Sequence, residues 1–266
     1  MPHITLNDIQ LEYRTIPGET GHAPPLVFLH EGLGSVSMWR DFPDKLTRQL
    51  RTSALVYSRR GYGQSSPLDG PRTPDFLHHE ALNVLPKVLA KLGIEKPLLI
   101  GHSDGASIAL IYAANFPETI AGAVLMAPHV LVEPISVSSI ARITETYETT
   151  DLRDRLSRHH AHIDDAFLGW SRIWLSPAFR TWNLGAECQR LSTPTLLIQG
   201  EDDEYGTLAQ LDAIQSAATN VPSNDPTTRT NIQRLVLSNC GHSPHRDQPA
   251  AVLDAISSFS ARLRTV

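Results

Sequence analysis

The sequence is poor in cysteine, in clustered basic residues and in long hydrophobic runs. No segment approaches the roughly 20 apolar residues of a membrane-spanning helix, so a membrane is not an expected partner. The formal net charge is -5 and no stretch is rich in Lys and Arg, which argues against a nucleic-acid partner. The two cysteines, Cys188 and Cys240, allow one disulfide at most. Residues Met1 to Ile4 lack the features of a secretory signal, so we expect a location in the reducing cytoplasm.

The composition is that of a globular protein with a sizeable core. Apolar residues make up 41% of the chain and charged residues 19%, which argues against wholesale disorder. The chain of 266 residues is longer than an average domain. Single α/β domains of roughly 200 to 250 residues are nevertheless common. We therefore predict one core that carries an insertion.

Short apolar runs alternate with helical patterns along most of the chain. The alternating residues 4–6 and 9–13 predict a hairpin. Continuous apolar runs, typical of strands buried on both faces, occur at residues 26–29, 54–57, 97–100, 123–126, 195–198 and 232–237. Apolar residues at steps of three and four predict one helix from Leu77 to Leu92, ended by Gly93, and a last helix from Val252 to Leu263. This order predicts an α/β fold with a mostly parallel, eight-stranded sheet covered by helices on both faces.

The alternation stops between residues 130 and 183. Helical stretches at 135–147 and 152–160 follow one another there without a strand. We predict a helical cap at residues 130–183, inserted into a core made of residues 1–129 and 184–266. The cap is rich in aromatic residues that either pack inside it or line a substrate pocket: Phe167, Trp170, Trp174, Phe179 and Trp182. Packing is the commoner role of such residues, and Trp170 and Trp174 are our candidates for substrate contact.

The segment Gly101-His102-Ser103-Asp104-Gly105 has the G-x-S-x-G pattern of a nucleophile elbow. It follows the predicted strand 97–100 and precedes a helical pattern, and this strand-turn-helix setting is what the motif requires. The turn is tight, so bulk at its flanks would collide with neighbouring backbone. The pattern predicts Ser103 as a nucleophile presented near the N-terminus of a helix.

A serine hydroxyl needs a base within hydrogen-bond reach, and that base needs a third group to orient it. The predicted strand 195–198 is followed by acidic residues, of which Asp203 and Asp202 are the candidates for the orienting acid. The loop after the last predicted strand carries His242, the favoured base, with His245 as the alternative. Both groups follow strands whose carboxyl ends should meet at one edge of the sheet.

Two backbone donors are needed to stabilise the oxyanion of acyl transfer. The N–H of Asp104, at the start of the helix after Ser103, is one candidate. The second should come from the loop after residues 26–29, where Gly32 is favoured over Glu31.

The neighbouring histidines His159, His160 and His162 could suggest a metal site. No cysteine or glycine-framed ligand set accompanies them. We expect a solvated surface of the cap here and no metal.

These motifs together resemble the α/β-hydrolase superfamily over essentially the whole chain: the loop 30–35, the segment 60–65, the elbow, Gly200 to Asp203 and Gly241-His242. The resemblance implies the chain order Ser, Asp, His and an acid three residues after the glycine that ends its strand, which favours Asp203 over Asp202. Within the superfamily the chain is similar to small capped esterases and to carbon-carbon hydrolases.

The Ser-Asp-Gly of the elbow is similar to that of valacyclovirase, the biphenyl hydrolase-like protein, whose aspartate recognises a substrate amino group. This resemblance implies a substrate-binding role for Asp104, unless its side chain only bonds the neighbouring loop. Most relatives have glycine after the loop histidine, whereas this chain has Glu31. Glu31 and Asp104 could form an acidic pair that favours cationic substrates or raises one carboxyl pKa, unless Glu31 points outward.

The expected activity is hydrolysis of a small carboxylic ester through an acyl-serine, without a metal or organic cofactor. The expected partner is therefore a small-molecule ester, and the chain is expected to be a monomer or homodimer. Cleavage of a carbon-carbon bond or of a lactone by the same triad is the alternative, and a non-catalytic ligand-binding protein is a remote one. Haloalkane dehalogenases and epoxide hydrolases of this fold use an aspartate nucleophile, so Ser103 argues against both.

Overall fold

The computed structural model describes residues 1–18, 23–219 and 232–263. The described strands form one sheet in the order β1-β2-β4-β3-β5-β6-β7-β8. Their bounds are β1 (His3–Leu6), β2 (Ile9–Ile16), β3 (Leu26–Leu29), β4 (Ala54–Tyr57), β5 (Leu98–His102), β6 (Gly122–Met126), β7 (Thr195–Gly200) and β8 (Ile232–Leu237). The pairs β1–β2 and β2–β4 are antiparallel, and the remaining pairs are parallel. The predicted eight-stranded, mostly parallel sheet is thus confirmed.

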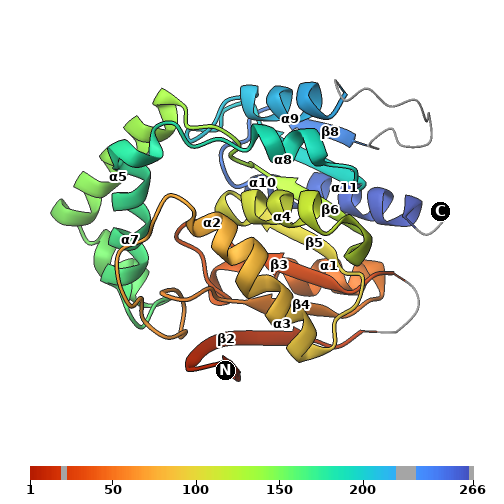
Figure 1. Ribbon diagram of the computed structural model, residues 1–266, viewed down its shortest axis with the longest axis horizontal. Coiled ribbons are helices and arrows are strands. Elements are labelled where there is room, and N and C mark those ends of the chain that lie inside the picture. Colours follow the sequence, from red (N-terminus) through yellow and green to blue (C-terminus); the bar gives the residue numbers. More distant parts are fainter. Residues whose placement is uncertain (19–22, 220–231, 264–266) are drawn as a thin grey trace.

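Helices cover both faces of the sheet (Figure 1). Helices α1 (Phe42–Leu50) and α11 (Pro249–Arg262) pack on one face, together with the short α10 (Pro244–Asp247). The other face carries α2 (Phe76–His79), the π-helix η2 (Glu80–Val84), α3 (Leu85–Leu92), α4 (Asp104–Asn115), α8 (Gly185–Arg190) and α9 (Ala209–Thr219). The short 3-10 helices are η1 (Ser37–Trp39), η3 (Pro117–Thr119) and η4 (Pro177–Phe179).

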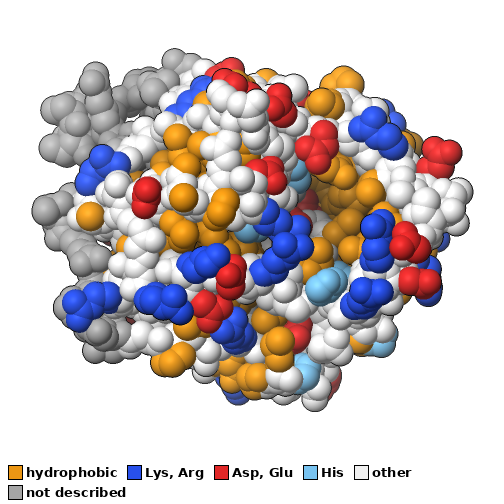
Figure 2. All heavy atoms as spheres, turned by 180° about the vertical axis from the view of Figure 1, so that it is seen from behind, with side chains coloured by type: hydrophobic (Ala, Val, Ile, Leu, Met, Phe, Trp, Pro, Cys, Tyr) orange, Lys and Arg blue, Asp and Glu red, His pale blue; other side chains and the backbone are white. Residues whose placement is uncertain are grey.

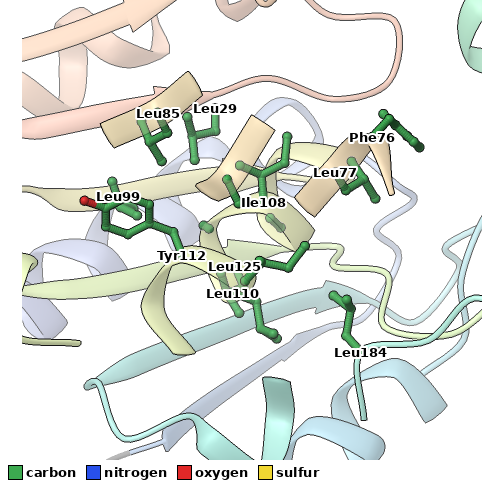
Figure 3. Close-up of a cluster of buried hydrophobic side chains, with 14 of the residues drawn as sticks. Leu29, Phe76, Leu77, Leu85, Leu99, Ile108, Leu110, Tyr112, Leu125 and Leu184 are labelled. Atoms are coloured by element: carbon green, nitrogen blue, oxygen red, sulfur yellow. The ribbon is translucent and has the colours of Figure 1, made fainter. Parts of the chain in front are cut away.

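The core lies between the sheet and these helices. Every residue of β3 and β4 is buried, because helices cover both faces of a parallel sheet. On the α4 side, Leu29 and Leu99 of the strands face Ile108 and Tyr112 of α4 (Figure 3). Helix α4 is buried on all sides, and this fixes the element that begins directly after Ser103.

The predicted helix from Leu77 to Leu92 differs from expectation in its middle. It runs as α2, η2 and α3, with a π-helical turn over Glu80–Val84. The backbone N–H of Leu85 donates to the carbonyl of Glu80, and Pro86, which follows, has no N–H to continue the regular ladder. The helix ends as predicted at Gly93, whose φ of 62° is left-handed.

Helices α5 (Pro134–Thr149), α6 (Leu152–Ser157) and α7 (Ile163–Leu175) follow one another between β6 and β7 and stand to one side of the sheet (Figure 1). The segment leaves and rejoins the core at one place, where Leu131 pairs with Asn183 and the N–H of Leu184 donates to the carbonyl of Val130 at 2.8 Å. Among the described residues, no helix has both the length and the apolar character needed to cross a membrane.

Candidate active site

Ser103 sits in a strained turn between β5 and α4. Its φ of 53° and ψ of -120° place a non-glycine residue at positive φ. A Cβ on Gly101 would lie 2.4 Å from the carbonyl oxygen of Gly105, and a Cβ on Gly105 would lie 1.9 Å from the carbonyl oxygen of Leu29. Both glycines are therefore required by the close packing of backbone around the serine.

The structure brings Ser103, His242 and Asp203 together, as the sequence predicted. The Ser103 Oγ lies 2.9 Å from the His242 Nε2. The His242 Nδ1 lies 2.8 and 3.0 Å from the two carboxylate oxygens of Asp203. The three residues follow β5, β8 and β7, whose carboxyl ends meet at one edge of the sheet.

Both oxygens of the Asp203 carboxylate accept hydrogen bonds from groups other than His242. Its Oδ1 accepts the backbone N–H groups of Tyr205 at 2.8 Å and Gly206 at 3.1 Å. Its Oδ2 accepts the side-chain amide of Gln199 at 3.0 Å. Burial by itself raises the pKa of Asp203, but the His242 charge and the hydrogen bonds from His242 and the Tyr205 N–H outweigh it and lower that pKa below its ordinary value. Asp203 therefore faces His242 as a carboxylate.

The interaction with Asp203 shifts the pKa of His242 in the opposite direction. Burial by itself lowers its pKa, but the charge of Asp203 and the hydrogen bond to it raise the pKa above the ordinary value of 6.5. A raised pKa makes this imidazole a stronger base toward the proton of Ser103.

The alternative acid and base lie elsewhere. Asp202 is exposed, and its backbone N–H donates to the Cys240 carbonyl at 3.0 Å. His245 is buried behind the site, with its ring 4.9 Å from that of Trp39 and 4.8 Å from that of His102. Neither residue makes a hydrogen bond to Ser103 or His242 in the part of the chain that the structure describes.

A cavity of about 110 Å³ opens at Ser103. The predicted oxyanion and substrate residues border it: Glu31, Gly32, Asp104, Trp170 and Trp174. Trp170 packs directly against Gly32, because a Cβ at that glycine would lie 2.2 Å from the indole nitrogen. Seen from behind, a hollow lined by hydrophobic side chains opens on the side of the molecule where α5 and α7 lie (Figure 1 and Figure 2). The two tryptophans are buried and border the cavity, so they serve packing and shape the pocket at once.

Asp104 is fully buried, and neither of its carboxylate oxygens has a hydrogen-bond partner among the described residues. The predicted alternative, a bond to the neighbouring loop, is therefore absent there. Burial raises the pKa of Asp104, and the nearby positive charge of Arg59, with its NH2 group 4.0 Å away, opposes this. Arg59 itself donates to the backbone carbonyls of His30 and Glu31 and so ties Asp104 to the loop after β3.

Glu31 points inward, contrary to the outward alternative. Its Oε2 lies 3.5 Å from the His102 Nδ1, and its Oε1 accepts the Arg246 guanidinium at 3.3 Å. Burial by itself raises the pKa of Glu31, but His102 and Arg246 hold it well below the ordinary value. The expected repulsion within an acidic pair does not dominate, since the raised pKa of Asp104 comes from burial.

A model of the alpha/beta hydrolase family matches residues 26–255 of the chain. The chain belongs to the alpha/beta hydrolase family. It is 22% identical to the sn-1-specific diacylglycerol lipase ABHD11 of Mus musculus over 280 residues, covering 96% of this chain and 87% of that protein. The alpha/beta hydrolase MGS-M2, from a Medee basin deep-sea metagenome library, superposes with a TM-score of 0.74 at 20% identity and covers 97% of this chain and 96% of its own. The enol-lactonase of Burkholderia xenovorans LB400 superposes with a TM-score of 0.70 at 22% identity, with coverage of 97% and 99%.

Two histidines that the sequence did not single out, His102 and His129, line the cavity at Ser103. His129 is buried, and its ring lies 5.6 Å from that of His242 and 5.0 Å from that of Trp174. Burial, together with the charge of His242, lowers the pKa of His129 to about 3, so it is neutral. Its position directly after β6, at the edge where the other site residues gather, was the available signal.

The expectation of a solvated histidine cluster in the cap is wrong for His160. This ring is buried, and its Nδ1 accepts the N–H of Gly63 at 3.0 Å while its Nε2 donates to the Leu33 carbonyl at 3.1 Å. Neighbouring His159 bonds Ser37 through Nδ1 at 2.8 Å. The pair thus connects residues 130–183 to the loops that hold Leu33, Ser37 and Gly63, and no cluster of possible metal ligands is found among the described residues.

Proposed function

We propose that this alpha/beta hydrolase cleaves small carboxylic esters through an acyl-serine intermediate. The observation that carries the proposal is the contact of 2.9 Å between the Ser103 Oγ and the His242 Nε2, with His242 fixed on its other side by Asp203. A nucleophile, a base and an orienting acid in this order are the parts that acyl transfer requires.

In the proposed reaction, Asp203 keeps the proton of His242 on Nδ1, so Nε2 is free to accept the proton of Ser103. The serine oxygen attacks the ester carbonyl, and the oxyanion accepts hydrogen bonds from the backbone N–H groups of Gly32 and Asp104. His242 then gives its proton to the leaving alcohol. A water molecule, activated by the same histidine, attacks the acyl-serine and releases the carboxylic acid.

The size of the pocket supports a small substrate. A cavity of about 110 Å³ bounded by Trp170, Trp174 and Ile140 leaves room for a short acyl group beside Ser103. We propose that residues 130–183 act as a cap that limits access from solvent. Ester cleavage is also supported by the similarity to a protein named as a diacylglycerol lipase, although its glycerolipid substrate is a property of that protein.

Lactone hydrolysis is the second candidate, since the chain superposes on an enol-lactonase. A lactone is a cyclic ester, so the same three residues would open it. Cleavage of a carbon-carbon bond in a vinylogous diketone is the further alternative. Recognition of an α-amino ester by Asp104 is less favoured, because Arg59 already lies 4.0 Å from that carboxylate.

Labelling with a fluorophosphonate, combined with a substrate panel, tests the proposal. We expect the wild type to form an adduct, Ser103→Ala to form none, and the control Ser138→Ala to react as the wild type does. Ser138 is exposed on α5, and its hydroxyl donates to the Ile135 carbonyl. Absence of an adduct on the wild type would favour the non-catalytic, ligand-binding alternative. The panel should contain short esters, matched α-amino esters, lactones and vinylogous diketones, and the fastest class then identifies the reaction.

A further inference from the structure

A chain of polar contacts that does not include Asp203 reaches the backbone of His242, the general base. Arg246 of α10 donates to the Met38 carbonyl at 2.9 Å and to the Glu31 Oε1 at 3.3 Å. The Oε2 of Glu31 faces the Nδ1 of His102 at 3.5 Å. The Nε2 of His102 lies 2.7 Å from the backbone carbonyl of His242. Residues from three separate regions of the chain, 31–38, 102 and 242–246, therefore meet behind the loop that carries His242.

The direction of the contact between His102 and His242 follows from its chemistry. A carbonyl oxygen only accepts, so the Nε2 of His102 carries a proton and donates. The Nδ1 of the ring faces the Glu31 carboxylate, which is likewise only an acceptor, so Glu31 holds the ring when Nδ1 is protonated too and His102 is the cation of the ion pair. The side chain of His102 is 1% exposed, so water cannot take over either contact. The ring is also enclosed by those of His242 at 5.2 Å and His245 at 4.8 Å.

We propose that Glu31 is a positioning residue, which fixes His102 and through it the backbone of His242. This inference rests on the proposed function, in which His242 must stay within hydrogen-bond distance of Ser103. The carboxylate borders the cavity, but its charge is already paired with Arg246 at 3.3 Å, which weakens its attraction for a cationic substrate. Displacement of a catalytic group by about 1 Å can cost about a hundredfold in rate, which makes a support behind the base valuable.

Glu31 also adds a negative charge near His242. The imidazolium of His242 is favoured by the charges of Asp203, Glu204 and Glu31, and His102, His129 and Tyr205 face the same ring. Asp203 acts most strongly and the charge of Glu31 adds to it, in the direction of a higher His242 pKa. Loss of the Glu31 charge should therefore lower the His242 pKa, whereas loss of a purely structural contact would leave it in place.

Steady-state kinetics of Glu31→Gln test this role, with neutral and cationic short esters as probes. We expect kcat to fall about tenfold for both ester types with little change in KM, because the base is displaced and the pocket is not. The acid limb of the kcat/KM profile should move to lower pH. Glu31→Asp keeps the charge and should keep the acid limb of the wild type, although its shorter side chain should still reduce kcat.

The matched control is Asp44→Asn. Asp44 is a partly buried carboxylate held by two hydrogen bonds from Arg14, on α1 away from Ser103. The substitution Asp44→Asn should leave kcat and the pH profile unchanged.

Three results would overturn the inference. A change confined to the KM of cationic esters would make Glu31 a substrate contact. An unchanged kcat and acid limb in a folded Glu31→Gln protein would remove the positioning role. If that protein does not fold, Arg246→Gln loosens the same carboxylate, and an unchanged kcat there would overturn the inference equally. If the wild type neither hydrolyses esters nor is labelled at Ser103, both the proposed function and this inference are wrong. If the wild type is active, a negative result with the Glu31 variants contradicts only the role of Glu31.

Discussion

The substitution Asp203→Asn replaces one carboxylate oxygen, which accepts hydrogen bonds, by an NH2 group, which donates them. Both oxygens of the carboxylate act as acceptors: Oδ1 for the N–H groups of Tyr205 and Gly206, and Oδ2 for Gln199, with His242 shared between them. An amide offers one oxygen only. Its NH2 group must therefore face at least one donor.

The less costly orientation places the amide oxygen at Oδ1, because the opposite one sets two backbone N–H groups against the NH2. Each unsatisfied buried donor costs about 1–3 kcal/mol. In the favoured orientation the Nδ1 of His242 lies 2.8 Å from the amide oxygen and 3.0 Å from the NH2, and a proton on Nδ1 would face the NH2 hydrogens, so the NH2 favours the tautomer with the proton on Nε2. That nitrogen then cannot accept the proton of Ser103. We expect kcat to fall about 10⁴-fold, or about 5 kcal/mol in activation free energy, with a loss of stability of about 1–3 kcal/mol.

Hydrolysis of a chromogenic short ester measures the first effect, and thermal unfolding measures the second. Asp202→Asn is the matched control, since it removes an exposed carboxylate one residue away and should retain the activity of the wild type. If Asp203→Asn keeps more than about a tenth of wild-type kcat, or if Asp202→Asn is the more damaged protein, the assignment of the acid is wrong.

Other substitutions and conditions give equally definite expectations. The raised pKa of His242 means that activity needs its neutral form and should fall as the pH drops through a value above 6.5; an acid limb below 6.5 in the kcat/KM profile would contradict this. Gly105→Ala places a methyl group 1.9 Å from the Leu29 carbonyl oxygen and should cost roughly 3 kcal/mol or more in thermal unfolding, whereas Gly70→Ala, with no atom within 4 Å, should be nearly neutral. Trp170→Ala removes a wall of the cavity and should raise kcat/KM for longer acyl chains relative to acetate, measured on a series of esters; an unchanged chain-length preference would show that this indole does not limit the pocket.

Much of the fold could be predicted because its signals are local. A strand buried on both faces is a continuous apolar run, and an elbow needs its glycines beside the nucleophile, so each signal lies within a few residues. The positions of Ser103, Asp203 and His242 after such strands followed from the same patterns, since parallel strands end at a common edge. Even here the π-helical turn before Pro86 was missed, because apolar spacing does not record a changed hydrogen-bond ladder.

What the sequence determined about this protein is therefore the order of its elements and the residue types at the ends of its strands. The tertiary structure alone decided which side chains are paired behind them. Glu31 contacts Arg246 across 215 positions of sequence, and His160 bonds Gly63 across 97. Such contacts depend on how residues 130–183 and the loops pack in three dimensions, and they cannot be predicted from the spacing of residues in the sequence. For the same reason, the largely buried position of Glu31 and its contact with His102 depend on the pairing of β3 with β5, which the sequence does not specify.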